Sequence, residues 1–213
     1  MTQPQTDGPM VEGADAGIDD DYVAGCPITP ELARQIADLA DLPWSDGKVT
    51  DGAMRALGWR DNDVIETING FVTGQGHVVY SDHDGFYMPF CHYYWVGGEV
   101  WTTDEWGALP GWSSQKGAGR EEFDGHVDAA VDRFAELLGP PQCDVRTEGR
   151  ATAIGPYSWR YAAWRRGGNA LVIGQVPEGF SLYQDEEAVV YIGALAEDAP
   201  FPEAAEFRDF LAP

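Results

Sequence analysis

Basic residues are scarce in this chain of 213 residues. Thirteen Lys and Arg stand against 36 Asp and Glu, which gives a formal net charge of -23 and a pI near 4.2. Binding to nucleic acid or to an anionic membrane needs Lys and Arg to displace counterions, so we expect neither partner. A cationic protein surface or a basic ligand would complement this charge. General solubility or adaptation to high salt is the alternative explanation, because only two lysines occur, Lys48 and Lys116.

Cysteine is also sparse. Cys26, Cys91 and Cys143 are odd in number and widely spaced, which favours neither a disulfide framework nor a zinc ribbon. The first residues lack a basic region followed by an apolar run, and no apolar segment approaches the length of a membrane span. These absences predict a cytoplasmic protein.

Catalytic motifs are missing as well. The sequence contains no Gly-x-Ser-x-Gly elbow, phosphate loop, zinc-protease helix or Rossmann fingerprint. Asp82, His83 and Asp84 have the residue types of a metal or acid–base site, but the same residues before a glycine are common turn formers. Cys91 and His92 are neighbours on a predicted strand and should point to opposite faces. We therefore predict no catalytic residue, metal or cofactor, with a ligand- or metal-binding enzyme using Asp82, His83 and His92 as the alternative.

The first 25 residues differ in composition from the rest of the chain. They carry six acids, no base and few apolar residues, which predicts a disordered acidic tail over residues 1–25. Residues 26–213 are predicted to form a single α+β domain. A division into subdomains 26–123 and 124–213 is left open, because each part opens with a helix that strands follow.

Helical signals are clearest after residue 123. Asp124 is a candidate N-cap, and Gly139 followed by two prolines should end the helix. The apolar face of this predicted helix consists of Val127, Val131, Phe134 and Leu138. Thr29 and Pro30 predict the start of an earlier helix, and residues 50–57 and 200–213 predict two short ones.

Strand signals fill most of the remaining sequence. Segments 64–68, 70–73, 77–80, 85–96, 157–165, 170–176 and 188–192 are rich in β-branched and aromatic residues and are separated by Gly, Asn, Asp and Pro. Pro89 argues that 85–96 is an edge strand or a pair of strands. The predicted fold class is α+β, with antiparallel sheet or sheets and helices packed on one face. Two similar α+β halves that share a core are the alternative form of this prediction.

The segment from residue 81 to 124 combines aromatic and acidic side chains. Trp offers a large rigid contact area, and carboxylates around it complement a basic surface. The alternative is an ordinary loop whose Trp side chains fill the core. The predicted partner-binding residues are Asp82, Asp84, Glu99, Trp101, Asp104, Glu105, Trp106 and Trp112.

The later half of the chain carries a family resemblance, borne by structural residues between 126 and 193. These are the helix end Leu137-Leu138-Gly139-Pro140-Pro141, then Trp159-Arg160 and Trp164, then Leu171-Val172-Ile173 and Val189-Val190-Tyr191-Ile192. Together they resemble small acidic immunity proteins encoded beside toxins in bacterial polymorphic-toxin systems. The resemblance implies a cytoplasmic, non-enzymatic protein that binds one cognate toxin and blocks its active site. It carries over no binding residue, since such proteins bind through variable surfaces, and a scaffolding module is a further alternative.

Overall fold

The structure is a computed structural model that describes residues 20–44, 47–64, 70–80, 85–96, 103–152, 155–177 and 185–211. Its centre is an antiparallel sheet in which β2, β3, β4, β5, β10, β9, β8 and β7 lie side by side in that order. A further strand, β1, pairs with β5 and with β6. The strands span Asp20–Gly25 (β1), Arg60–Asp61 (β2), Gly70–Val72 (β3), Val78–Tyr80 (β4), Gly85–Val96 (β5), Ser113–Lys116 (β6), Cys143–Thr152 (β7), Gly155–Arg166 (β8), Asn169–Pro177 (β9) and Asp185–Ala194 (β10).

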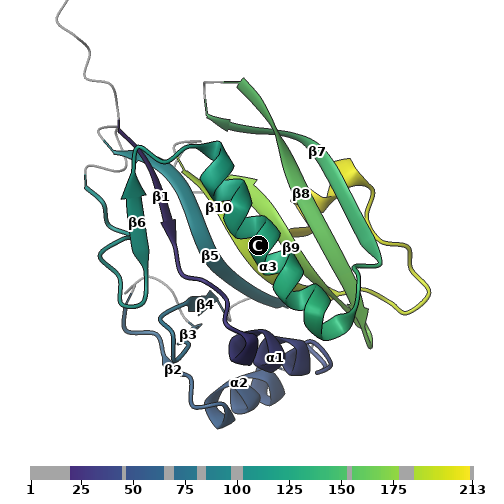
Figure 1. The fold of residues 1–213 in the computed structure, drawn as a ribbon. Coiled ribbons are helices and arrows are strands. Elements are labelled where there is room, and N and C mark those ends of the chain that lie inside the picture. Colours follow the sequence, from purple (N-terminus) through teal and green to yellow (C-terminus); the bar gives the residue numbers. More distant parts are fainter. Residues whose placement is uncertain are drawn as a thin grey trace, which may run out of the picture.

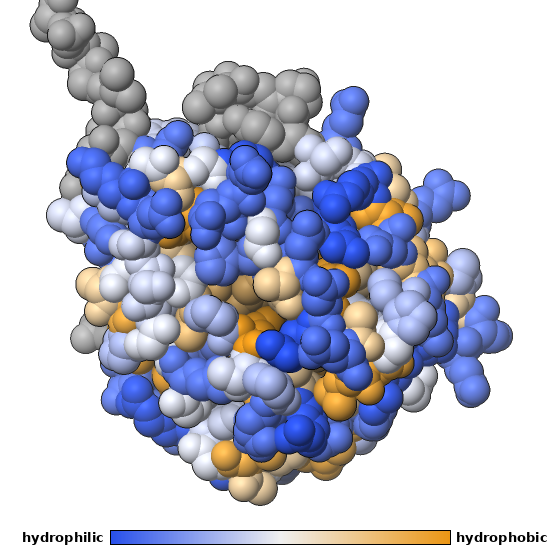
Figure 2. Space-filling view, viewed as in Figure 1, coloured by the Kyte–Doolittle hydropathy of each residue, from blue (hydrophilic) through white to orange (hydrophobic). Residues whose placement is uncertain are grey.

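Helices cover both faces of the sheet to different extents. The three longer ones, α1 (Pro30–Leu39), α2 (Gly47–Ala56) and α3 (Arg120–Leu138), lie on the near face in Figure 1. Hydrophilic side chains cover most of the surface seen from that side, with hydrophobic ones in small separate patches (Figure 2). A 3-10 turn, Ala204–Glu206, and α4 (Phe207–Leu211) pack on the other face, where Phe207 stacks on Tyr161. The α+β class with an antiparallel sheet is confirmed.

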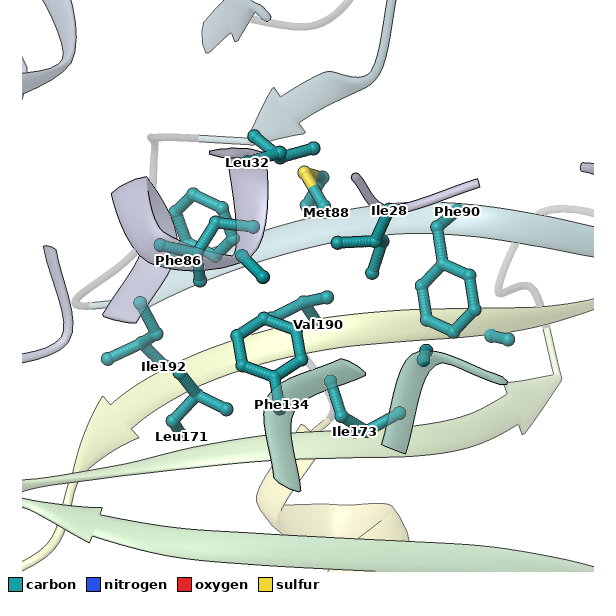
Figure 3. Close-up of a cluster of buried hydrophobic side chains, with 14 of the residues drawn as sticks. Ile28, Leu32, Phe86, Met88, Phe90, Phe134, Leu171, Ile173, Val190 and Ile192 are labelled. Atoms are coloured by element: carbon teal, nitrogen blue, oxygen red, sulfur yellow. The ribbon is translucent and has the colours of Figure 1, made fainter. Parts of the chain in front are cut away.

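One core joins the early and late parts of the chain. β5 pairs with β10, so strands from the two predicted subdomains are neighbours in the same sheet. Figure 3 shows Phe134 of α3 next to Val190 of β10, with Leu171 and Ile173 of β9 on either side of it. All four side chains are buried. Burial of apolar area at this common interface is the main term that stabilises the fold.

The central helix is longer than its apolar pattern predicted. α3 begins at Arg120 with Gly119 as N-cap, so Asp124 lies inside the helix and its predicted capping role is wrong. The additional turn buries Phe123. Val127, Val131 and Phe134 are buried on the predicted face, while Leu138 is only partly buried at the helix end. Gly139, with a φ of 82°, ends the helix as predicted.

Pro89 lies in the interior of the sheet, so its predicted place on an edge strand is wrong. β5 has β10 along one side, while β4 and β1 follow one another along the other. The register of β10 against β5 shifts at Ala188 and Val189, directly opposite Pro89. A β-bulge tolerates a residue that cannot donate to the ladder, which explains how proline fits in a central strand.

Two further strands differ from expectation. Residues 20–25 form β1, so the predicted disorder is wrong for that stretch; Val23 and Ala24 are buried between β5 and β6. The remainder of the predicted tail, residues 1–19, and most of the predicted strand 64–68 lie outside the described residues. β7 occupies a segment that has few apolar residues and gave no strand signal.

Candidate functional site

β5 presents two chemically different faces where it pairs with β1. Cys91 and Tyr93 point into the core beneath the helices, whereas Tyr94 packs on the other side with Ala24 and Trp112. His92 lies on the same side as Tyr94, because strand side chains alternate. The prediction that Cys91 and His92 face opposite directions is confirmed.

The segment that follows residue 102 closes over this second face of β5. The ring of Trp106 stacks on His92, with centroids 3.7 Å apart and planes 10° apart. Trp112 lies 5.4 Å from His92 and 5.9 Å from Trp106, between centroids. The Trp112 indole N–H donates to the carbonyl oxygen of Gly76 at 3.1 Å. The stacked pair of His92 and Trp106, with Trp112 tilted against both rings, therefore attaches this segment to the sheet.

A buried carboxylate supports the histidine of this stack. His92 Nδ1 lies 3.2 Å from Oδ2 of Asp185, and both side chains are fully buried. A carboxylate at Nδ1 orients the imidazole and favours the tautomer that carries its proton there. With Trp106 over its face, His92 is closed off from bulk solvent. The alternative of a ligand-binding enzyme therefore depends on Asp82 and His83, which lie outside the described residues.

Asp104 organises the turn that carries Trp106. Its Oδ1 accepts hydrogen bonds from the Tyr94 hydroxyl at 2.5 Å and from the Gly107 N–H at 2.8 Å, and its Oδ2 accepts one from the Ser114 hydroxyl. Burial works to raise the pKa of Asp104, but these three hydrogen bonds outweigh it and hold the pKa below its usual value. Burial together with this carboxylate raises the pKa of Tyr94. Asp104 is therefore an ionised structural anchor of the turn.

A cysteine and a histidine meet beneath Trp112. Cys26 Sγ lies 3.7 Å from His77 Nδ1, and His77 Nε2 lies 2.8 Å from the carbonyl oxygen of Cys26. These are the residue types of a nucleophile and its base, and sequence reasoning missed them because they are 51 positions apart. Burial raises the pKa of the Cys26 thiol to about 11 and lowers the pKa of His77 to about 4. Both groups are thus neutral at pH 7, and the pair contains no thiolate nucleophile.

Tight backbone contact explains why this region needs glycine. Gly76 and Gly111 both have positive φ, 99° and 85°. A Cβ at Gly76 would collide with the carbonyl oxygen of Pro110, and one at Gly111 would collide with that of Gln75. The turn before β4 and the segment before β6 thus touch through their main chains.

The predicted partner-binding residues have different surroundings. Asp82, Asp84, Glu99 and Trp101 lie outside the described residues. Of the other four, Trp112 is buried at 8% exposure, Asp104 and Trp106 are partly buried, and Glu105 is exposed. These contacts show Asp104 and Trp112 holding the segment onto the sheet, while Glu105 and the uncovered part of Trp106 are available at the surface. Their contact with a partner stays a prediction.

Three buried acids at the start of β10 form a second polar cluster, and of these only Glu186 faces α3, while Asp185 and Glu187 contact His92 and Tyr87. Asp185, Glu186 and Glu187 are consecutive and all buried. Glu186 Oε2 accepts hydrogen bonds from Arg120 Nη1 and from the Trp159 indole, at 3.0 Å for the latter. Its Oε1 has no hydrogen-bond partner within the described parts of the chain. Burial raises the pKa of Glu186 to about 7, although Arg120 and Trp159 work to lower it. Sequence reasoning missed this cluster, because three consecutive acids ordinarily indicate a solvated loop.

Exposed carboxylates without an ion pair among the described residues lie on the helical face and also elsewhere. On the helical face they are Asp38 on α1 and Glu121, Glu122 and Asp132 on α3. At other positions they are Glu105, Glu148, Glu197, Asp198, Glu203, Glu206 and Asp209. The same helices lie on the face that Figure 2 shows as largely hydrophilic. This surface carries more carboxylates than the ion pairs within the described residues neutralise.

Comparison with protein-family models, with curated proteins and with solved structures finds no match for this chain. No helix in the described ranges combines the length and apolar composition that a bilayer crossing requires. Within those same ranges, no group of three or more His, Cys, Asp and Glu is arranged to hold a metal ion.

Proposed function

We propose that this chain is a non-catalytic immunity protein that binds the basic toxin domain of a bacterial polymorphic-toxin system and occludes its active site. The observation that carries the proposal is the surplus of exposed carboxylates in a protein in which nine of the eleven arginines already make contacts within the chain. The resemblance of residues 126–193 to immunity proteins supports the same class. We place its action in the cytoplasm, where such inhibitors protect the producing cell.

Nine of the eleven arginines make contacts within the protein. Those that form ion pairs with its own carboxylates are Arg34, Arg55, Arg60, Arg120, Arg133, Arg146, Arg160 and Arg166. Arg165 instead donates to the carbonyl oxygens of Ala196 and Ala199, at 2.6 and 2.5 Å. Few cations are therefore left to balance the exposed acids of α1 and α3, which keeps the helical face negative.

The proposed mechanism has two stages. Long-range attraction first steers the basic toxin domain towards the acidic face, and close contact then places carboxylates in the cationic groove that the toxin uses for its substrate. Glu105 and the accessible part of Trp106 are the described members of the predicted patch that can touch a partner. They lie on the face of β5 opposite α3, so a partner must reach beyond the helical face to touch them. Because Asp104 and Trp112 are structural, their contribution to binding would be indirect.

The test uses the basic toxin domain that the proposal expects to be encoded beside this gene. Co-expression with the chain should restore growth that the toxin alone abolishes, and the purified pair should associate fastest at low salt. The triple variant E121K/E122K/D132K should slow association by about 10-fold or more at low ionic strength, since electrostatic steering contributes a factor of that order. Stopped-flow fluorescence would measure the rate.

A matched variant separates steering from net charge. E197K/D198K/D209K changes the charge by the same amount at exposed positions away from α3, and it should slow association by less than the α3 variant. An association rate that does not depend on salt, or equal slowing by the two triple variants, would contradict steering by the helical face. Failure to restore growth would contradict the immunity function itself.

A further inference from the structure

β7 forms one end of the sheet. It pairs with β8 along its length, from Cys143 opposite Ala163 to Thr152 opposite Gly155. Among the described residues, no other strand pairs with β7 and no backbone hydrogen bond from another element reaches it. An open edge strand of this length is a template on which another strand can add.

The direction of the unpaired backbone groups follows from the neighbouring strand. The N–H of Arg160 donates to Gln175 Oε1 at 2.5 Å, so the backbone of Arg160 points towards β9. Arg146 lies opposite Arg160 in the register and must therefore turn its own N–H and C=O away from β8. By alternation, Asp144 and Glu148 do the same. The open edge thus presents the backbone groups of residues 144, 146 and 148.

The residues whose backbone groups face the open edge carry side chains that alternate in charge. Asp144, Arg146 and Glu148 are all exposed, and position 150 of the sequence is an arginine. Arg146 has one distant ion pair, 3.6 Å to Asp128, and 51% of its side chain is exposed. Glu148 has no ion pair within the described part of the chain. Arg146 and Glu148 are thus available to an incoming strand, whereas Asp144 already forms an ion pair with Arg160 at 2.6 Å.

We propose that β7 pairs antiparallel with β7 of a second copy of this chain, about a two-fold axis that passes through Thr147. In this register Arg146 lies opposite Glu148 of the partner, Glu148 lies opposite its Arg146, and Asp144 lies opposite position 150. Every outward-facing residue meets another outward-facing residue, so the hydrogen-bond pattern and the charge pattern agree in one register. A two-fold interface must be complementary to itself, and the Asp-x-Arg-x-Glu-x-Arg sequence of this strand satisfies that condition.

Charge exchange tests the pairing and its register. R146E and E148R should each bring like charges face to face twice, and each should raise the dimer dissociation constant by roughly 10- to 100-fold in sedimentation equilibrium. The double variant R146E/E148R should dimerise like the wild type. Mixing the two single variants should also restore dimers, because the carboxylate introduced at position 146 of one copy then faces the guanidinium introduced at position 148 of the other.

Control variants and a backbone measurement complete the test. R34E and E31R make the same charge changes on exposed residues of α1 and should leave dimerisation unaltered. Hydrogen exchange should show concentration-dependent protection of the amides of Arg146 and Glu148, but not of Val145 and Thr147, whose amides face β8. A wild-type chain that stays monomeric at millimolar concentration would overturn the proposal, and so would single variants that dimerise as well as the wild type.

Salt separates this interface from the proposed toxin contact. Two copies that each carry a net charge of -23 repel one another at long range, so the dimer should become stronger as salt screens that repulsion. Association with a basic toxin should change in the opposite direction. The experiments can thus contradict the dimer while they support inhibition of the toxin, or contradict inhibition while they support the dimer.

Discussion

Replacement of Trp112 by alanine is expected to lower the free energy of unfolding by about 3–5 kcal/mol. Trp112 is 8% exposed, contacts the rings of His92 and Trp106, and donates its indole N–H to Gly76. Truncation would leave a cavity between β5 and the segment that precedes β6, and it would remove the hydrogen bond to the turn before β4. Chemical denaturation monitored by circular dichroism measures the loss.

Trp106 provides the matched comparison. It is only partly buried, and its stacking on His92 contributes about 1 kcal/mol beyond burial, so W106A should cost clearly less stability than W112A. Relative to the stability that each variant loses, W106A should weaken toxin binding more than W112A, because part of the Trp106 ring reaches the surface. If W112A is as stable as W106A, Trp112 does not anchor the segment, and the structural role derived for it is wrong.

Sequence periodicity predicted the parts of the fold that depend on local chemistry. The face of α3 follows from Val127, Val131 and Phe134 at helical spacing, and the Thr29 cap is confirmed by its hydrogen bond from the Leu32 N–H. Strand β5 covers 85–96 as predicted. Such features are encoded within one helix or strand, so a single sequence is enough to find them.

The features that sequence analysis missed depend on distant partners. β7 has alternating charges and only Val145 as a branched apolar residue, and its strand conformation comes from pairing with β8. In the sequence, the residues of β1 are the end of a polar tail. Their strand conformation comes from pairing with β5 and β6. The place of Pro89 depends on a bulge in β5 at its pairing with β10, about 100 positions later in the chain.

The predicted site shows the same limit. Its aromatic and acidic composition was visible, yet composition cannot separate Asp104, whose oxygens accept hydrogen bonds within the protein, from Glu105, which is exposed. Trp106 and Trp112 look alike in sequence. In the structure Trp106 stacks on His92 and stays partly exposed, whereas Trp112 is buried and donates a hydrogen bond to Gly76. Adjacent residues have different tertiary contacts, and these contacts decide which carboxylates and rings are accessible to a toxin.

Replacement of Arg120 by methionine is expected to cost about 3 kcal/mol of stability at pH 8 and about 1 kcal/mol at pH 5. Arg120 contributes a charge-assisted hydrogen bond to Glu186, which is fully buried, and a second one to Asp124 at 3.1 Å. Methionine keeps much of the apolar stem but removes the guanidinium, which lies over the Phe123 ring at 5.0 Å, and leaves the Glu186 carboxylate without its cation. At pH 5 the carboxyl group binds a proton and the missing charge matters less. R133M, which breaks the exposed pair of Arg133 with Glu136, is the control and should cost less than about 1 kcal/mol.

The pH dependence of Glu186 itself fixes the sign of this effect. Folding raises its pKa from 4.5 to about 7, so the folded protein retains a proton that the unfolded chain has released within that range. The contribution of this group to stability is therefore present at low pH and is lost as pH rises through about 7, at about 1.4 kcal/mol per pH unit and about 3 kcal/mol in total. E186Q cannot ionise, so the difference in unfolding free energy between the wild type and E186Q should change by that amount between pH 4 and pH 8.

The double variant R120M/E186Q should recover most of the stability that R120M loses at pH 8, because no uncompensated charge is then buried. A double variant as unstable as R120M, or a difference between wild type and E186Q that is constant with pH, would show that burial of the Glu186 charge is not what Arg120 offsets.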